Sequence, residues 1–170
     1  EICIKAEKSV SEKNTKIIVL SDKKVDHNNV AFPSLLAVSA VHHHLIKKGL
    51  RTRCSIIAET GEAREVHHFC LLAGYGAEAI FPYLAYETIN NLDQYSPLNN
   101  SNNLVNIESS YITAIGKGIL KVMSKMGIST YQSYNGAQIF DAVGLNSKFI
   151  LDYFTGTASL IEGIGFKEVI

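Results

Sequence analysis

The chain has 170 residues, 46% of them hydrophobic and 19% charged, and its 16 basic and 16 acidic side chains give a formal net charge of zero. This length and composition are typical of one soluble globular domain with a full hydrophobic core. They exclude a global basic field of the kind that attracts nucleic acids and anionic membranes, and no apolar run approaches the roughly 20 residues that cross a bilayer.

The cysteines and the chain ends give two further expectations. Cys3, Cys54 and Cys70 are widely spaced and form no CxxC pair, which indicates reduced thiols, buried or half-buried, in a reducing compartment. The chain starts without Met and stops in mid-pattern, so we expect a piece of a longer polypeptide.

The first half of the chain predicts two strand–helix units. Residues 5–15 are polar and indicate a loop or a frayed helix end, whereas the β-branched run over residues 16–20 is typical of a strand buried on both faces of a parallel sheet. Apolar side chains at 3–4 spacing then predict a helix over residues 34–48, which Gly49 ends. The second unit begins with a strand over residues 53–58.

The second unit continues with a helix that starts after Glu62 and ends at Gly74 or Gly76, and residues 77–83 predict a third strand. Residues 86–106, rich in Asn and Ser, are expected to be an exposed connection and the least structured part of the chain. The later segments predict, in order, a long helix over 108–126, a strand over 128–133, a short helix over 137–143, a helical turn or two over 147–154 and a glycine-rich exit over 155–165.

Strands that alternate with helices predict the α/β class, with parallel βα units and right-handed crossovers. Four such units do not close a (β/α) barrel. The sequence therefore predicts either an incomplete, barrel-like sheet or an open doubly wound sheet, in both cases as part of a larger domain.

The histidines do not predict a metal site. The triplet His42, His43 and His44 spreads over about 200° of a helix, so its members cannot ligate one ion together, and we expect one buried and two partly exposed rings. Glu65 and His68 have the i,i+3 spacing of di-iron helix bundles, but such a site needs a second pair and two further Glu-bearing helices, which this pattern lacks.

Three carboxylates are the strongest candidates for chemistry. Asp22, Glu59 and Glu87 each follow a predicted strand, at the edge where α/β proteins carry their sites. They could belong to a working or vestigial site, or to a pocket that binds a small molecule, although helix N-capping explains Asp22 and Glu59 equally well. No nucleophile–base pair and no glycine-rich phosphate loop accompanies them, so we predict no catalytic and no cofactor-binding residue.

Three long strings carry a resemblance to a known family: RTRCSIIAETGEAREVHHFCLLAGYGAEAIFPYLAYETI, PSLLAVSAVHHHLIKKGLRTR before it and GKGILKVMSKMGISTYQSYNGAQIFDAVGL after it. They resemble the central domain of the glutamate synthase large chain. The similarity covers residues 16–145 and continues more weakly through FTGTASLIEGIG, but it leaves out residues 90–106. On this basis residues 1–145 are expected to be the C-terminal portion of the central domain, and residues 146–170 a helical and glycine-rich exit toward the FMN-binding domain.

The resemblance implies a large enzyme that converts glutamine and 2-oxoglutarate, with two electrons, into two glutamates. Its partners for this segment would be a glutaminase domain and an FMN-binding domain of the same polypeptide, with ferredoxin or NAD(P)H as the electron donor and the cytoplasm or the plastid as the compartment. FMN and an iron–sulfur cluster are implied for the full-length enzyme, and none for this segment. The central domain would hold the two active sites in register so that ammonia passes between them.

The stretch KVMSKMGISTYQSYNGAQ is the best candidate for an interdomain contact, because Met, Gln and Tyr side chains adapt to a partner or supply contact area. The residues predicted for this contact are Lys121, Ser124, Lys125, Gln132, Tyr134 and Gln138. Two alternatives compete with the structural role: a free-standing α/β enzyme or metal-binding protein that uses the strand-end carboxylates and histidines, and a half-barrel that binds a small molecule.

Overall fold

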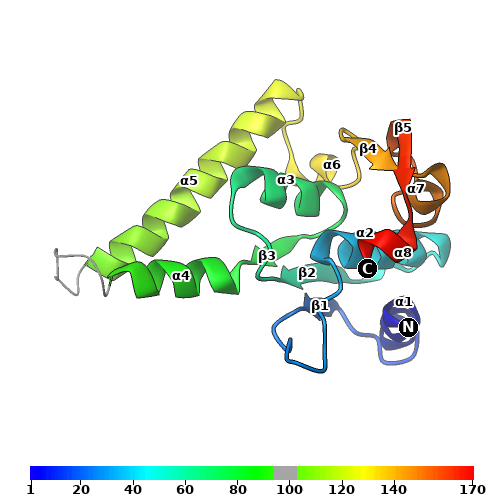
Figure 1. Ribbon diagram of the computed structural model, residues 1–170, viewed down its shortest axis with the longest axis horizontal. Helices are drawn as coiled ribbons and strands as arrows, with labels where there is room; N and C mark the ends of the chain where they lie inside the picture. The colour runs from blue at the N-terminus through cyan, green and yellow to red at the C-terminus, as the bar shows by residue number, and fades with distance from the viewer. Residues whose placement is uncertain (94–102) are drawn as a thin grey trace.

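A computed structural model describes residues 1–93 and 103–170 of the chain (Figure 1). Its first sheet has three parallel strands in the order β1 (Ile17–Ser21), β2 (Ser55–Glu59) and β3 (Ala79–Phe81). Helix α2 (Ser34–Lys47) and the short 3-10 turn η1 (Arg51–Arg53) connect β1 to β2. Helix α3 (Val66–Gly74) connects β2 to β3, so the two predicted βα units are confirmed.

Helix α2 lies at the centre of the core. Its buried residues run from Leu36 to His42 and include Leu45, so it is apolar around most of its circumference. The reason is that it has neighbours on several sides: helix α1 (Ile2–Ser11), strands β1 and β2, and helix α7 (Ser147–Tyr153). The predicted helix end is also confirmed, since Gly49 follows with a φ of 67° that favours glycine.

Two predictions about the first residues are wrong. Residues 2–11 form a regular helix, α1, rather than the loop or frayed helix end predicted over residues 5–15, because Ala6 and Val10 pack on Val41 and Leu45 of α2. Strand β1 is not buried on both faces: Ile17 and Val19 are 57% and 54% exposed, while Ile18 and Leu20 turn toward the core. The strand lies at the edge of the sheet, and helices cover one of its faces within the described residues.

The region predicted to be least structured is largely helical where it is described. Helix α4 covers Tyr83–Asp93 and helix α5 covers Asn103–Lys125, while residues 94–102 of that prediction lie outside the described residues. The Tyr86 ring packs on Phe81 and Tyr111, which supplies tertiary contacts that the Asn-rich pattern does not reveal. Helix α5 packs against α3 and α4, and helices α4 and α5 extend away from the sheets (Figure 1). The predicted long helix is therefore confirmed.

The last part of the chain differs most from expectation. The strand predicted over residues 128–133 is wrong: its second half belongs to the short helix α6 (Tyr131–Tyr134), which begins where Thr130 Oγ1 accepts a hydrogen bond from the Ser133 amide. The predicted helix over 137–143 is replaced by strand β4 (Asp141–Leu145), since positive φ angles at Gly136 and Gln138 interrupt any helix there. The predicted exit is strand β5 (Ala158–Ile164), which is followed by helix α8 (Phe166–Val169).

Strands β4 and β5 form a second, two-stranded parallel sheet, connected by α7 as predicted for residues 147–154. The register shifts on both sides of Val143, and Gly144 has a φ of 77° at this irregularity. The chain is thus an α/β assembly of parallel units in small sheets, and within the described residues no barrel closes. This confirms the predicted class and the prediction of an incomplete sheet.

The three cysteines are free thiols, with Cys54 and Cys70 buried and Cys3 half-buried. Burial raises the pKa of each of them. In the part of the chain that the structure describes, no helix is both long enough and apolar enough to span a membrane.

Candidate functional site

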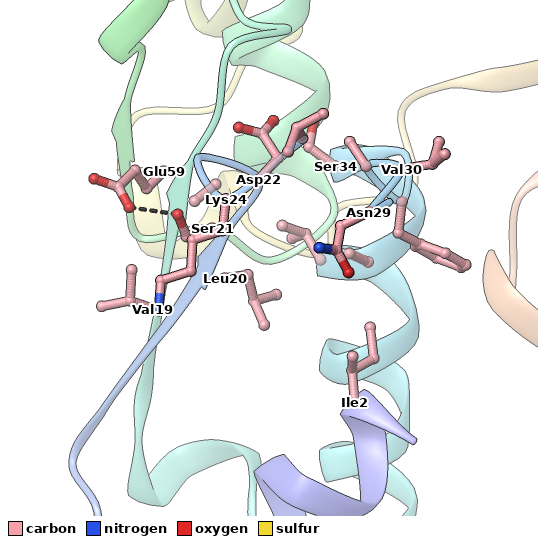
Figure 2. A pocket seen from close by; sticks show the side chains of 16 residues that line it. Ile2, Val19, Leu20, Ser21, Asp22, Lys24, Asn29, Val30, Ser34 and Glu59 are labelled. Carbon is pink, nitrogen blue, oxygen red and sulfur yellow. Dashed lines mark hydrogen bonds between the residues drawn. The ribbon is translucent and has the colours of Figure 1, made fainter. Parts of the chain in front are cut away.

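A groove of about 340 Å³ lies at the carboxyl ends of β1 and β2, and two of the predicted carboxylates, Asp22 and Glu59, line it (Figure 2). Its walls come from the end of β1, the loop that follows β1 and the first turns of α2. The parallel register places Ser21 of β1 opposite Glu59 of β2, so polar side chains from adjacent strands emerge at the same level. The groove therefore lies where α/β folds hold ligands.

Asp22 supports the turn that follows β2. Its Oδ2 accepts a hydrogen bond of 2.6 Å from Thr60 Oγ1, and both its oxygens lie 3.1 Å from the amide nitrogen of Gly61. Thr60 is only 1% exposed, so its hydroxyl depends on this acceptor. Asp22 is thus a structural acceptor for a turn, rather than a helix N-cap.

Helix N-capping at this edge is carried out by a residue that the sequence did not reveal. Glu62 Oε2 accepts hydrogen bonds from the Ser34 amide at 2.9 Å and from Ser34 Oγ at 2.6 Å, at the start of α2. The cap comes from 28 residues away along the chain, so no local pattern could predict it.

Glu59 and Ser21 form a pair at the mouth of the groove. Ser21 Oγ donates a hydrogen bond to Glu59 Oε2, as the dashed line in Figure 2 shows. A serine nucleophile needs a base poised near neutral pH and donors for the developing oxyanion. Among the described contacts of Ser21, a carboxylate is present and a histidine is not. The pair fits a strand-end hydrogen bond.

All three predicted carboxylates affect the pKa of one hydroxyl group, that of Tyr83. Glu87 lies within α4, one turn after Tyr83, rather than directly after a strand. Burial first, then a side-chain hydrogen bond with Asp22 and the charges of Asp22, Glu87 and Glu59, raise the pKa of Tyr83 to about 12. A tyrosine held in its neutral form can donate a hydrogen bond but is a poor base, so this arrangement fixes geometry rather than moving protons.

The histidines occupy the positions that the helical spacing predicts. His42 is buried, while His43 and His44 are half-buried. His44 Nε2 lies 2.7 Å from Glu7 Oε2 and thereby connects α2 to α1. His68 lies 3.4 Å from Glu65, which precedes α3. Across residues 1–93 and 103–170, no group of three His, Cys, Asp or Glu side chains is arranged to hold a metal ion.

The residues predicted for interdomain contact separate into two groups. Tyr134 is fully buried against Cys70, Ala73 and Met123, so its side chain belongs to the core. The exposed members are Lys121, Ser124, Lys125, Gln132 and Gln138. The structure adds Leu120 and Met126, which are 65% and 51% exposed at the same end of α5.

These observations define a parallel α/β segment whose polar sheet edge is stabilised by hydrogen bonds between strands and turns. Residues 1–146 match the family model described as the glutamate synthase central domain. The chain belongs to this family.

The relatives extend the match across bacteria, fungi and algae. The chain is 53% identical over 164 residues to a protein named glutamate synthase [NADPH] large chain from Bacillus subtilis, which covers 96% of this chain and 11% of that protein. It is 49% identical over 158 residues to glutamate synthase [NADH] of Saccharomyces cerevisiae, covering 89% of the chain and 7% of that protein. It is 43% identical over 179 aligned residues to ferredoxin-dependent glutamate synthase of Pyropia yezoensis, covering 99% of this chain and 12% of that protein. The chain thus spans about a tenth of the length of these relatives.

Proposed function

We propose that this chain is the connecting segment of a glutamate synthase that makes glutamate from glutamine and 2-oxoglutarate with two electrons, and that its role is structural. It holds a glutaminase domain and an FMN-binding domain of the same polypeptide in register, so that ammonia reaches the second site. The family membership of a segment that spans about a tenth of each relative carries this proposal.

The distribution of apolar side chains supports a surface that the rest of a longer polypeptide covers. Val143, Leu160 and Ile161 of the second sheet are 72%, 92% and 57% exposed, and Ile17 and Val19 of β1 add to the exposed strand surface. Exposed apolar clusters of this kind mark contact surfaces in soluble proteins, and open sheet edges are normally covered.

The residues present do not fit the iron–sulfur cluster that the full-length enzyme implies. An iron–sulfur cluster needs converging cysteine thiolates. Cys3 and Cys54 belong to one core cluster and Cys70 to another, and burial raises the pKa of all three thiols. The electron donor is also independent of this segment in our proposal, because relatives named for NADPH, NADH and ferredoxin all match nearly the whole chain.

The proposal is tested by charge introduced on the predicted contact surfaces of the full-length enzyme. Leu160→Asp and Lys125→Glu are expected to leave each domain folded but to uncouple the two reactions, so that glutamine is hydrolysed with less glutamate formed per glutamine. Ile4→Asp is the matched control for the first variant, because Ile4 is 55% exposed on helix α1, outside the second sheet and outside the lining of the groove, and also exchanges an exposed aliphatic side chain for Asp. Unchanged coupling in both variants, with the domains still assembled, refutes the structural role.

A further inference from the structure

A second cavity, separate from the sheet edge, opens between helix α2 and the segment that follows α6. Its volume is about 430 Å³, which is within the range of small-molecule sites. His42 and His43 of α2 form one side, Asn135 and Gln138 the opposite side, and Tyr75 and Phe140 line it with aromatic rings. The two rings stack on each other with centroids 6.1 Å apart.

His42 presents a fixed hydrogen-bond donor to this cavity. Arg51 Nε donates to His42 Nδ1 at 2.9 Å, and because a guanidinium can only donate, Nδ1 must hold a lone pair. The proton of the neutral ring is therefore on Nε2, which lies 3.8 Å from where a Cβ on Gly136 would stand. Burial chiefly, and then the charge of Arg51, lowers the pKa of His42 to about 4, so the ring remains neutral.

Two nitrogen atoms on other lining residues are buried without a hydrogen-bond partner in the part of the chain that the structure describes: His43 Nε2 and Asn135 Nδ2. A buried polar group left unpaired costs about 1–3 kcal/mol, and natural proteins retain such groups where a ligand or a function requires them. The amide nitrogen can only donate, and His43 Nε2 donates in the tautomer that places its proton there. The cavity thus offers several donors without matching acceptors.

The charges around the cavity favour an anion. None of its lining residues is Asp or Glu. Burial and then the charge of Lys47 lower the pKa of His43, which places a second cation near this wall in addition to Arg51. Two carboxylates nearby do not belong to the lining. Glu78 lies 2.7 Å from an Arg51 nitrogen, and Asp141, whose charge adds to the effect of burial in raising the pKa of Tyr75, is itself exposed.

We propose that this cavity binds a small carboxylate, with the carboxylate oxygens held by His42 Nε2 and Asn135 Nδ2 and the organic part against Tyr75 and Phe140. The ligand would satisfy the unpaired nitrogen atoms and would gain from the positive surroundings. This inference is independent of the structural role proposed above, because the residues that line the cavity include none of the predicted contact residues except Gln138.

Calorimetry on the full-length polypeptide tests the ligand class with three probes of one shape. Benzoate is expected to bind once per chain, and benzamide at least about tenfold more weakly because it lacks the charge, while benzylamine should not bind. A crystal or cryo-EM structure with benzoate should show it between His42 and Asn135. Absence of binding in solution, equal binding of benzamide, preference for benzylamine, or a segment of the same polypeptide already filling the cavity each overturns the proposal.

A pair of isosteric variants tests the position. Asn135→Asp replaces the donor with a carboxylate and should weaken benzoate binding by at least about tenfold. Asn146→Asp is the matched control: Asn146 Oδ1 accepts from the Phe149 amide at 2.8 Å, which Asp can also do, so binding should stay within about twofold. Unchanged binding in Asn135→Asp overturns the proposed site, and the comparison of probes on the unaltered protein decides the ligand class even if that variant does not fold.

Discussion

Helix α5 contains two glycines, Gly116 and Gly118, that allow a controlled test of the packing between α5 and α3. A Cβ added at Gly116 meets no atom within 4 Å, whereas one added at Gly118 would lie 2.3 Å from Val66 Cγ2 and 2.8 Å from Val66 Cγ1. The two positions share one helix and one substitution, so they differ in their neighbours rather than in backbone preference.

The magnitudes follow from these distances. Alanine in a helix is more favourable than glycine by about 0.5–1 kcal/mol, and Gly116→Ala should stabilise α5 by this amount. Gly118→Ala gains the same but places a methyl group more than about 1 Å inside the optimal carbon–carbon separation of about 3.5–4.0 Å. Val66 is β-branched and stiff, so the overlap should cost about 1–3 kcal/mol. Gly118→Ala should therefore be about 1–3 kcal/mol less stable than Gly116→Ala.

Hydrogen exchange in the full-length polypeptide measures this difference locally. Amides of α3 and of residues 107–125 should exchange about 5-fold to 140-fold faster in Gly118→Ala than in Gly116→Ala, since about 1.4 kcal/mol corresponds to a factor of ten. Adding Val66→Ala to the Gly118 variant makes room for the methyl group, so the double variant should be at least about 1 kcal/mol more stable than the two single changes predict when added. Equal exchange in the two glycine variants, or strict additivity, would refute the packing of α5 on α3.

Three further variants test the interior of the chain and the sheet edge. The pKa of His42 is about 4 in the fold against a reference value of 6.5, so the stability contributed by the neutral ring is complete above pH 6.5 and is lost as the pH falls toward 4, by at most about 3 kcal/mol. The variant His42→Asn can still accept from Arg51 and should flatten the pH dependence of the unfolding free energy; an unchanged slope contradicts this. Asp22→Ala leaves the hydroxyl of Thr60 without its acceptor and should destabilise the turn by about 1–3 kcal/mol, as measured by hydrogen exchange. Asp22→Asn should keep the catalytic turnover of the full-length enzyme. A collapse of turnover in a folded Asp22→Asn enzyme would show that this edge of the sheet is catalytic. Tyr134→Ala should cost about 3–5 kcal/mol of unfolding free energy because its ring fills the core, whereas Tyr134→Phe should cost less than about 1 kcal/mol because the hydroxyl faces the thiol of Cys70, a weak hydrogen-bond partner; similar losses in both variants would contradict this placement.

The elements that sequence reasoning predicted correctly are those specified by near neighbours in the chain. Helix α2 has an apolar 3–4 spacing and ends before Gly49. The positive φ angle of Gly49 follows from its place at the C-terminal end of the helix. The wrong predictions fall where distant contacts decide. Strand β4 exists because β5 pairs with it, and the positive φ of Gln138 is not a conformation that its residue type announces.

The sheet edge shows the same division between placement and role. Chain order alone was enough to place Asp22 and Glu59 at one end of the sheet, because parallel strands align their carboxyl ends. Their roles depended on which donors face them, namely Thr60 and Gly61 for the first and Ser21 for the second. A carboxylate that already accepts from a buried hydroxyl and a turn amide is committed to the fold, so its position at the carboxyl end of a strand does not by itself make it catalytic.

The His42 cavity illustrates the opposite case: the sequence predicted that one histidine ring is buried, but it did not predict which nitrogen atom of that ring carries the proton. The helical spacing correctly predicted a single buried ring in the histidine triplet, yet it carried no information about the protonation of that ring. That property is set by Arg51, nine residues further on, whose Nε can only donate and so fixes the tautomer. Arg51 is itself held by the carbonyl groups of Cys54 and Gly76 and by Glu78, so the orientation of the His42 donor depends on the βα unit that residues 51–78 form. A unit whose sequence carries part of the family resemblance therefore also determines what the cavity can bind.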